Sequence, residues 1–158
     1  MQPRTAPTIL ADVNALFAQH RASSVTVTGH SLGAALALLD AVYLPLHLPA
    51  GTRVRMVGYG MPRVGNGAFA DYVDASGVLT LTHVNNREDP VPIVPGRFLG
   101  FVHPSGEVHI QDTGAWDACP GQDNPSVLCI VGDVPNVLDG DILDHLGPYD
   151  DDIYMGLC

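Results

Sequence analysis

The segment Ser24-Val25-Thr26-Val27-Thr28-Gly29-His30-Ser31-Leu32-Gly33-Ala34-Ala35-Leu36-Ala37 decides the fold of this chain. Its first part is β-branched and typical of a strand, and its last part is rich in Ala and Leu, typical of a helix. Between them, residues 29–33 fit the pattern G-x-S-x-G, in which a serine sits on a sharp strand-to-helix turn. Small residues two positions on either side are expected to relieve backbone crowding there. The pattern therefore predicts that Ser31 is a nucleophile.

Outside this segment, helical and strand patterns alternate as far as residue 84. Ile9, Val13, Leu16 and Phe17, for example, recur at helical spacing. Such alternation predicts an α/β fold with a mostly parallel sheet, right-handed crossovers and flanking helices. In chain order we expect a helix over 7–20, a strand over 24–28, a helix from 32 to about 43, a strand over 54–59, a helix including 68–73, and a strand over 78–84.

The pattern changes after residue 90, where turn-forming residues become frequent. Residues 98–102 and 107–110 flank His103-Pro104-Ser105-Gly106, and this arrangement predicts a β-hairpin. Beyond residue 112 the chain is rich in Asp, Pro and Gly, so we expect a long loop that is functional and held by a disulfide.

Composition limits the class of protein. The 158 residues suffice for one domain, 46% of them are hydrophobic, and the net charge is −10. All seven basic residues are Arg, and so acidic a chain is expected to repel nucleic acid. The longest apolar run, Leu32 to Leu39, is too short for a membrane span, and no signal peptide is visible at the start of the chain.

Cysteine usage points to an oxidising compartment. Cys119 and Cys129 bracket a loop rich in Pro, Gly and Asn, so we expect a local disulfide between them. Cys158 is then left without a partner. We therefore expect that a missing N-terminal portion supplies the partner of Cys158, and that the 158 residues alone have little or no activity.

A serine nucleophile requires a general base and a carboxylate that orients the base. Where the chain order is serine, acid, histidine, the acid follows a later strand. The expected strand over 78–84 leads into Glu88 and Asp89. Asp89 is favoured because the proline after it holds the backbone extended, whereas Glu88 could equally be a solvated loop charge.

Seven histidines compete for the role of base, namely His20, His30, His47, His83, His103, His109 and His145. The side chain of His30 is expected to point away from the Ser31 hydroxyl. Histidines in strands or hairpins, such as His103, are more often structural than catalytic. Only His145 follows the acid and lies in a C-terminal loop, so order and location favour it over His103.

The segment 24–37 resembles the nucleophile segment of fungal class 3 lipases, which are α/β-hydrolases and include feruloyl esterases. The likeness covers nearly the whole chain from residue 5. It continues through Tyr59-Gly60-Met61-Pro62-Arg63-Val64-Gly65-Asn66, through 85–95, and through His103-Pro104-Ser105-Gly106-Glu107 and Asp144-His145-Leu146. The resemblance implies a catalytic triad of Ser31, Asp89 and His145, and so selects Asp89 over Glu88.

By the same resemblance, residues 1–158 form a single, partial α/β-hydrolase domain that lacks the family's N-terminal strands, its lid and its first oxyanion donor. The donor that remains is the backbone N–H of Leu32, at a helix N-terminus. The resemblance also includes a bridge in the loop between the first two cysteines. Residues 61–64 and 91–94 are expected to line an acyl pocket, with plain core packing as the alternative.

Aspartates gather near the end of the chain and offer a calcium site as one interpretation. They lack the spacing of an EF-hand, so a solvated acidic loop is favoured, and we expect no metal and no cofactor. The cluster consists of Asp139, Asp141, Asp144, Asp150, Asp151 and Asp152.

Together these features predict a serine carboxylic ester hydrolase that acts on acylglycerols or related esters in lipid catabolism. The alternatives are an inactive lipase-like remnant with a binding role, and a feruloyl esterase or acyltransferase that uses the same triad. The expected partners are an ester or lipid substrate and a lipid interface, and the full-length protein is expected to be secreted.

Overall fold

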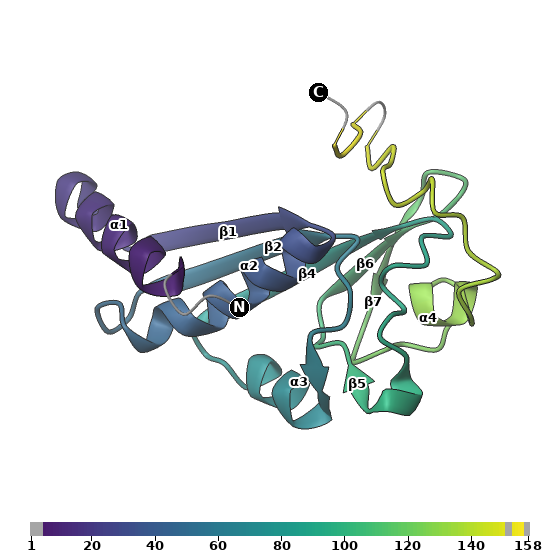
Figure 1. The fold of residues 1–158 in the computed structure, drawn as a ribbon, viewed down its shortest axis with the longest axis horizontal. Coiled ribbons are helices and arrows are strands. Elements are labelled where there is room, and N and C mark those ends of the chain that lie inside the picture. Colours follow the sequence, from purple (N-terminus) through teal and green to yellow (C-terminus); the bar gives the residue numbers. More distant parts are fainter. Residues whose placement is uncertain (1–4, 151–152, 157–158) are drawn as a thin grey trace.

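A computed structural model describes residues 5–150 and 153–156 (Figure 1). The helices are α1 (Thr5–His20), α2 (Leu32–Tyr43), α3 (Gly67–Asp74) and α4 (Ile130–Asp133), with 3₁₀ turns η1 (Leu44–Leu46) and η2 (Arg97–Leu99). The strands are β1 (Ser24–His30), β2 (Arg53–Tyr59), β3 (Gly65–Asn66), β4 (Leu79–Asn86), β5 (Phe101–Val102), β6 (Glu107–Ile110) and β7 (Trp116–Cys119). The expected elements up to residue 84 are therefore present, most with slightly different ends.

Five strands form the main sheet in the order β1-β2-β4-β6-β7. The first four are parallel and β7 is antiparallel to β6, which confirms the mostly parallel α/β sheet. β1 is an edge of this sheet within the described residues. The register aligns His30 of β1 with Tyr59 of β2, so the carboxyl ends of these two strands finish side by side.

The main core lies between the sheet and α2. Val54 and Met56 of β2 are buried, while Arg53 and Arg55, which alternate with them, are exposed, as the two-residue period of a strand requires. Alanines on α2 allow the helix to approach the sheet closely. A methyl group added at Gly58 of β2 would come within 3.2 Å of the Ala34 Cβ, so both small residues are needed for this contact.

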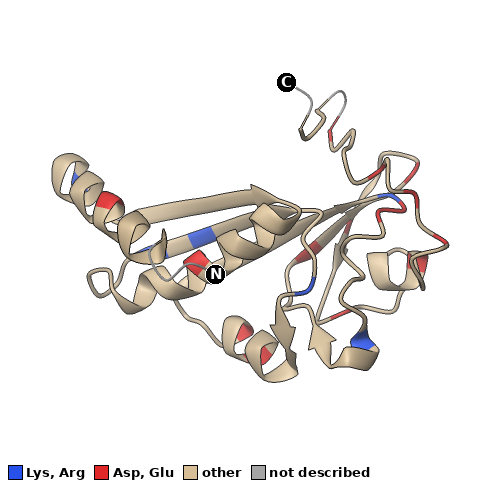
Figure 2. Cartoon of the chain, viewed as in Figure 1, with Lys and Arg blue, Asp and Glu red and all other residues tan. Residues whose placement is uncertain are grey.

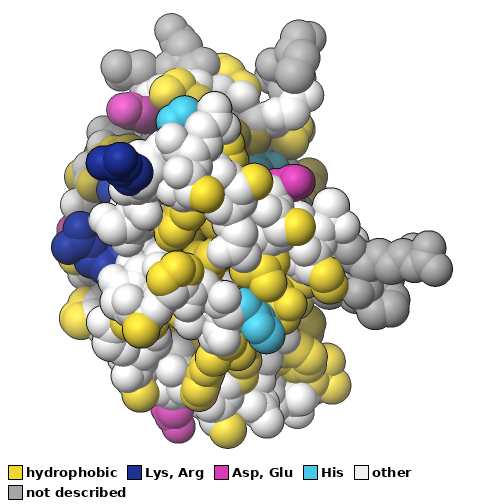
Figure 3. Space-filling model, turned by 90° about the vertical axis from the view of Figure 1, so that its left-hand side faces the viewer, with side chains coloured by type: hydrophobic (Ala, Val, Ile, Leu, Met, Phe, Trp, Pro, Cys, Tyr) yellow, Lys and Arg dark blue, Asp and Glu magenta, His cyan; other side chains and the backbone are white. Residues whose placement is uncertain are grey.

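Helix α1 lies at the end of the sheet where β1 begins, and it contains no fully buried residue (Figure 1). Ile9, Val13 and Phe17 contact the core along one side, as their helical spacing predicts, whereas Leu16 is 52% exposed. Figure 3 views the molecule from this end and shows hydrophobic side chains at the surface among polar groups.

The prediction of a β-hairpin over residues 98–110 is wrong. β5 pairs with β3 in a separate two-stranded sheet, and β6 joins the main sheet beside β4. The turn at Gly106, where φ is +112°, redirects the chain from one sheet to the other, and the Gly106 carbonyl accepts a hydrogen bond from His83 of β4. The hairpin that does form joins β6 to β7, part of the region that was expected to be a loop.

The predicted Cys119–Cys129 disulfide is present and closes the loop after β7, with its Cα atoms 5.8 Å apart. Beside it, the buried carboxylate of Glu107 accepts a hydrogen bond of 2.8 Å from the Ile130 N–H at the start of α4. Burial raises the pKa of Glu107. The disulfide and this hydrogen bond together attach the irregular C-terminal third to the sheet, and Figure 2 shows that acidic residues gather at this end of the molecule.

No helix among the described residues combines the length and apolar character that a membrane span requires. Cys158, Asp151 and Asp152 lie outside the described residues. The expectations that concern them are therefore not addressed by the structure.

Candidate active site

Ser31 lies between the last residue of β1 and the first residue of α2, with φ 56° and ψ −131°. A positive φ is costly for a residue with a Cβ, and it turns the chain sharply from strand to helix. The Ser31 N–H donates to the Tyr59 carbonyl at 2.9 Å, which ties the turn to the end of β2. The Ser31 hydroxyl makes no capping hydrogen bond to α2, so it is not committed to the helix.

The two glycines of the pattern have unequal roles. A Cβ at Gly29 would lie 2.4 Å from the Gly33 carbonyl oxygen, so only glycine fits where β1 meets α2. A Cβ at Gly33 would meet nothing within 4 Å. The expectation that crowding requires a small residue on both sides is therefore met only at Gly29.

Asp89 and His145 are joined by a hydrogen bond in which the His145 Nδ1–H donates to Asp89 Oδ2 at 2.8 Å. Asp89 is completely buried, and its other oxygen accepts from the Val91 N–H at 2.8 Å. These contacts orient the carboxylate and make Nδ1 the protonated ring nitrogen of His145, which leaves Nε2 as a proton acceptor. Glu88, the alternative acid, is exposed.

The loop that carries His145 has no regular secondary structure and is held by the turn that carries Asp89. The Asn86 side-chain amide donates to the Asp144 carbonyl at 2.9 Å, and the Asp141 N–H donates to the Glu88 carbonyl at 2.8 Å. The Asp144 carboxylate also accepts from the Glu88 N–H at 3.3 Å. Residues that directly precede His145 are therefore fixed to residues that directly precede Asp89.

Two residues that sequence reasoning missed complete this arrangement. Gly60, directly after β2, has φ +52°, and a Cβ there would lie 2.8 Å from His145 Nδ1 and 2.9 Å from Asp89 Oδ2. Tyr149 is buried, and its hydroxyl donates to the His145 carbonyl at 3.1 Å. Burial, followed by the nearby charge of Asp89, raises the pKa of the Tyr149 hydroxyl, so it remains a donor. The sequence does offer one signal for Gly60, because a glycine directly after a parallel strand often lies where the backbone closely approaches a site.

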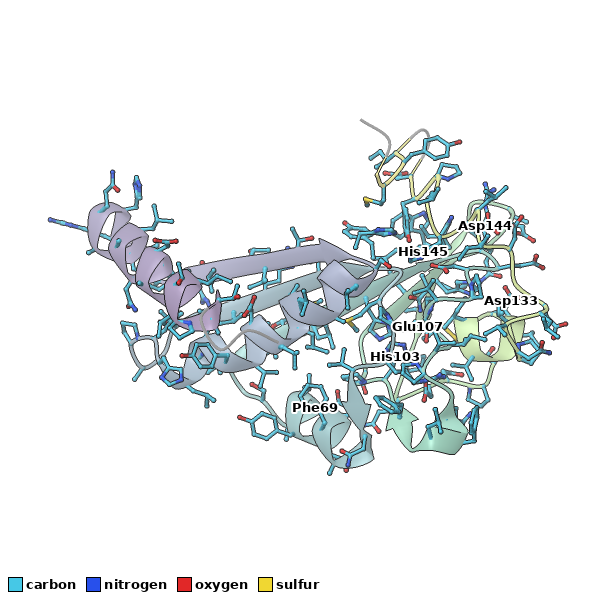
Figure 4. All side chains as sticks on the ribbon, in the orientation of Figure 1. Phe69, His103, Glu107, Asp133, Asp144 and His145 are labelled. Carbon is cyan, nitrogen blue, oxygen red and sulfur yellow. A yellow bond between two sulfur atoms is a disulfide. The ribbon has the colours of Figure 1, made fainter. Side chains whose placement is uncertain are left out.

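His103, the alternative base, is buried away from the Asp89–His145 pair. Its Nε2 lies 2.8 Å from the Pro92 carbonyl, and its ring stacks on that of His83 at 4.8 Å. Figure 4 shows His145 and Asp144 close together at one end of the sheet, with His103 well apart from them. Burial lowers the pKa of His103 to about 4, so its ring is neutral and structural.

Three aspartates of the cluster contact other groups of the chain. Asp141 Oδ1 accepts from the Leu143 N–H at 2.9 Å, Asp139 accepts from the Asn136 amide, and Asp144 lies 3.9 Å from the Arg87 guanidinium. The contacts of Asp139 and Asp141 stabilise turns, and that of Asp144 is an ion pair with Arg87.

An open groove of about 830 Å³ lies between η2 and the segment after α4. From the two expected pocket segments it includes Arg63, Ile93 and Val94, whereas Met61 belongs to the core. Its walls are mainly apolar, and three of its residues, Phe98, Leu99 and Val137, are at least half exposed. The groove is lined by Arg63, Ile93, Val94, Pro95, Gly96, Arg97, Phe98, Leu99, Val131, Val134, Pro135, Asn136 and Val137.

A parallel sheet with a strained serine at a strand-to-helix turn, and a buried Asp–His pair at the same end of the sheet, defines an α/β-hydrolase. Residues 4–99 match the family model for class 3 lipases. The chain belongs to the class 3 lipase family.

Similar proteins are secreted fungal lipases. A secreted mono- and diacylglycerol lipase of Malassezia restricta is 48% identical over 63% of this chain and 34% of its own length. Another from Malassezia globosa is 37% identical over 90% of this chain and 45% of its own length. The solved structure of Rhizomucor miehei triacylglyceride lipase has a TM-score of 0.81 and 33% identity, covering 96% of this chain and 56% of that protein. The chain thus spans less than half the length of these two curated relatives.

Proposed function

We propose that the chain is the catalytic portion of a secreted serine ester hydrolase that acts on acylglycerols, with Ser31, Asp89 and His145 as its triad. The observation that supports this most strongly is the buried Asp89–His145 hydrogen bond beside the strained Ser31 turn. A further support is that His30, the residue before Ser31, packs against His145 with 4.4 Å between the ring centroids. A solved relative, 34% identical over 89% of this chain, is described as a triacylglycerol lipase whose catalytic centre is a serine protease triad.

In this mechanism Ser31 Oγ attacks the ester carbonyl carbon while His145 Nε2 takes the hydroxyl proton. His145 then gives the proton to the leaving alcohol, and water, activated by the same nitrogen, releases the acid from the serine. Asp89 stays ionised and stabilises the imidazolium. The Leu32 N–H stabilises the oxyanion, because the first N–H groups of a helix have no partner within it.

The apolar groove supports a fatty acyl chain as the part of the substrate that is bound. Its lining includes Ile93, four residues after Asp89, and Val137, eight residues before His145. Leu32 and Leu143, which neighbour the triad in sequence, are 67% and 68% exposed. Exposed apolar side chains near a lipase site favour contact with a lipid interface. Residues 1–158 are proposed to form one part of a single domain.

Labelling with a fluorophosphonate and, on separate unlabelled samples, hydrolysis of a short-chain nitrophenyl ester test this proposal. The chain and a version extended upstream to the length of the relatives are both assayed. The active form is expected to be labelled at Ser31, and Ser31→Ala is expected to lose at least about 10³-fold in turnover while remaining folded. Ser23→Ala, at an exposed serine near the start of β1, is the matched control. Turnover by Ser31→Ala close to that of the unaltered protein would refute the triad.

A further inference from the structure

His30 contacts the catalytic histidine through both its ring and a hydrogen bond. It is the last residue of β1 and directly precedes Ser31. Its ring centroid lies 4.4 Å from that of His145, with the two planes inclined by 34°. Its Nε2 lies 2.7 Å from the His145 carbonyl oxygen. The residue before the nucleophile therefore contacts both the side chain and the backbone of the base.

The His145 carbonyl has two donors. In addition to His30 Nε2, the Tyr149 hydroxyl donates to the same oxygen at 3.1 Å, and the Tyr149 ring packs edge-on against that of His30. A carbonyl oxygen has two lone pairs, so both are used here. The peptide plane after His145 is thereby fixed from two directions, and the direction of its side chain is fixed with it.

The charge state of His30 suits this role. A carbonyl can only accept, so His30 Nε2 must be the protonated nitrogen. Burial lowers the pKa of His30, which keeps its ring neutral near pH 7. A neutral ring against His145 supports the base without repelling the imidazolium that forms on it during the reaction.

We propose that His30 is a positioning residue that holds the backbone of His145 so that its Nε2 faces the Ser31 hydroxyl. This role rests on the proposed function, since it assigns His30 to the same triad. Without the anchor, the loop that carries His145 would keep its ties to the Asp89 turn on the N-terminal side of the base, but the His145 carbonyl would keep the Tyr149 hydroxyl as its one remaining side-chain donor among the described residues. A shift of about 1 Å in the position of a general base can lower the reaction rate on the order of a hundredfold.

Two substitutions separate the hydrogen bond from the ring contact. His30→Phe keeps an aromatic ring against His145 but has no donor, whereas His30→Gln keeps an N–H near the position of Nε2 without the ring. The matched control is His47→Phe, because His47 is exposed and its ring packs on that of Tyr43 at 4.2 Å. Tyr43 is the last residue of α2, at the opposite end of the helix from Ser31. All are measured in the active form of the protein with a nitrophenyl ester.

For His30→Phe we expect kcat to fall about ten- to a hundredfold with KM changed less than about twofold, because the chemical step is affected and substrate binding is not. His30→Gln is expected to recover most of that loss. Combined with Tyr149→Phe, the loss is expected to exceed the product of the single effects, because each single variant leaves the carbonyl one donor. A kcat for His30→Phe equal to that of the His47→Phe control would overturn the proposal.

Hydrogen exchange provides a readout that does not depend on turnover. Amides in 142–149 are expected to exchange faster in His30→Phe than in the unaltered protein or in His30→Gln, while those of α2 stay unchanged. If the loop exchanges identically in all variants, His30 does not anchor it. Failure of the proposed function would be distinct, since it would appear as an unaltered protein that neither reacts with fluorophosphonate nor turns over ester.

Discussion

At the scale of single residues, the site depends on the lack of a Cβ at Gly60. Gly60 follows β2 and has no Cβ, and the space where one would stand lies within 3 Å of the Asp89 and His145 side chains and the Tyr149 hydroxyl. Its φ of +52° also favours glycine. The side chains of Asp89 and His145 can therefore meet only because the residue that directly follows β2 has no side chain.

Gly60→Ala is expected to lower ester turnover about a hundredfold, because one methyl group would separate Asp89 from His145. The unfolding free energy should also fall by about 1–3 kcal/mol. Gly51→Ala is the control, since Gly51 has φ +84° but open space around its Cβ position. It should lose about 1–2 kcal/mol of stability from backbone strain alone and retain full activity. Equal activity in the two variants would contradict this account of Gly60.

At the scale of elements, the junction of β1 and α2 brings the helix close enough to the strand to place Ser31 at the turn. The contact between Gly29 and the Gly33 carbonyl fixes how tightly the chain reverses. The side of Gly33 where a Cβ would stand is open in this chain. The symmetry of the sequence pattern therefore does not correspond to a symmetry of packing.

We expect Gly29→Ala to disrupt the turn, with a loss of at least about 3 kcal/mol in the unfolding free energy or no soluble protein, because backbone cannot give way to a Cβ at 2.4 Å. Gly33→Ala, the same change four residues later, should fold with a stability within about 1 kcal/mol of the unaltered protein or above it, because alanine favours a helix. Urea denaturation of both variants provides the comparison. If Gly33→Ala lost as much unfolding free energy as Gly29→Ala, the Cβ position at Gly33 would not be open, and this account of the turn would be wrong.

At the scale of the whole molecule, two buried histidines couple stability to pH. Burial, followed by the proximity of His103, lowers the pKa of His83 to about 3, and burial lowers that of His103 to about 4. Both rings are fully buried and stacked between β4 and the segment before β6. In the unfolded chain each would titrate near pH 6.5, so below that pH the unfolded state binds more protons than the folded state.

The unfolding free energy is therefore expected to be at its full value above pH 6.5 and to fall as the pH drops towards 4, by about 1.4 kcal/mol per pH unit for each histidine. Replacing one of the pair, as in His103→Gln, should remove about half of the slope that the pair contributes, even if it lowers stability at every pH. His47→Gln, at an exposed histidine, should leave the slope intact. Urea midpoints measured between pH 4 and pH 7.5 test this prediction. An unchanged slope of unfolding free energy against pH in His103→Gln would contradict it.

The sequence by itself determined what depends on neighbouring residues. The strand, turn and helix around Ser31 follow from β-branched residues, glycines and alanines that lie within 14 positions of one another. The disulfide joins cysteines only 10 positions apart and could be predicted from the loop between them. Chain order and family resemblance also pointed to Asp89 and His145, and the structure brings these two side chains into contact.

Tertiary structure alone decided the contacts that join distant segments. The bond from His30 to the His145 carbonyl spans 115 positions, and the space at Gly60 is set by three side chains from two separate segments. The pairing of β5 with β3 instead of β6 was likewise hidden, because short strands with turn residues between them satisfy either partner locally. Local patterns constrain backbone conformation over a few residues, whereas which surfaces meet depends on how the whole chain buries its apolar area.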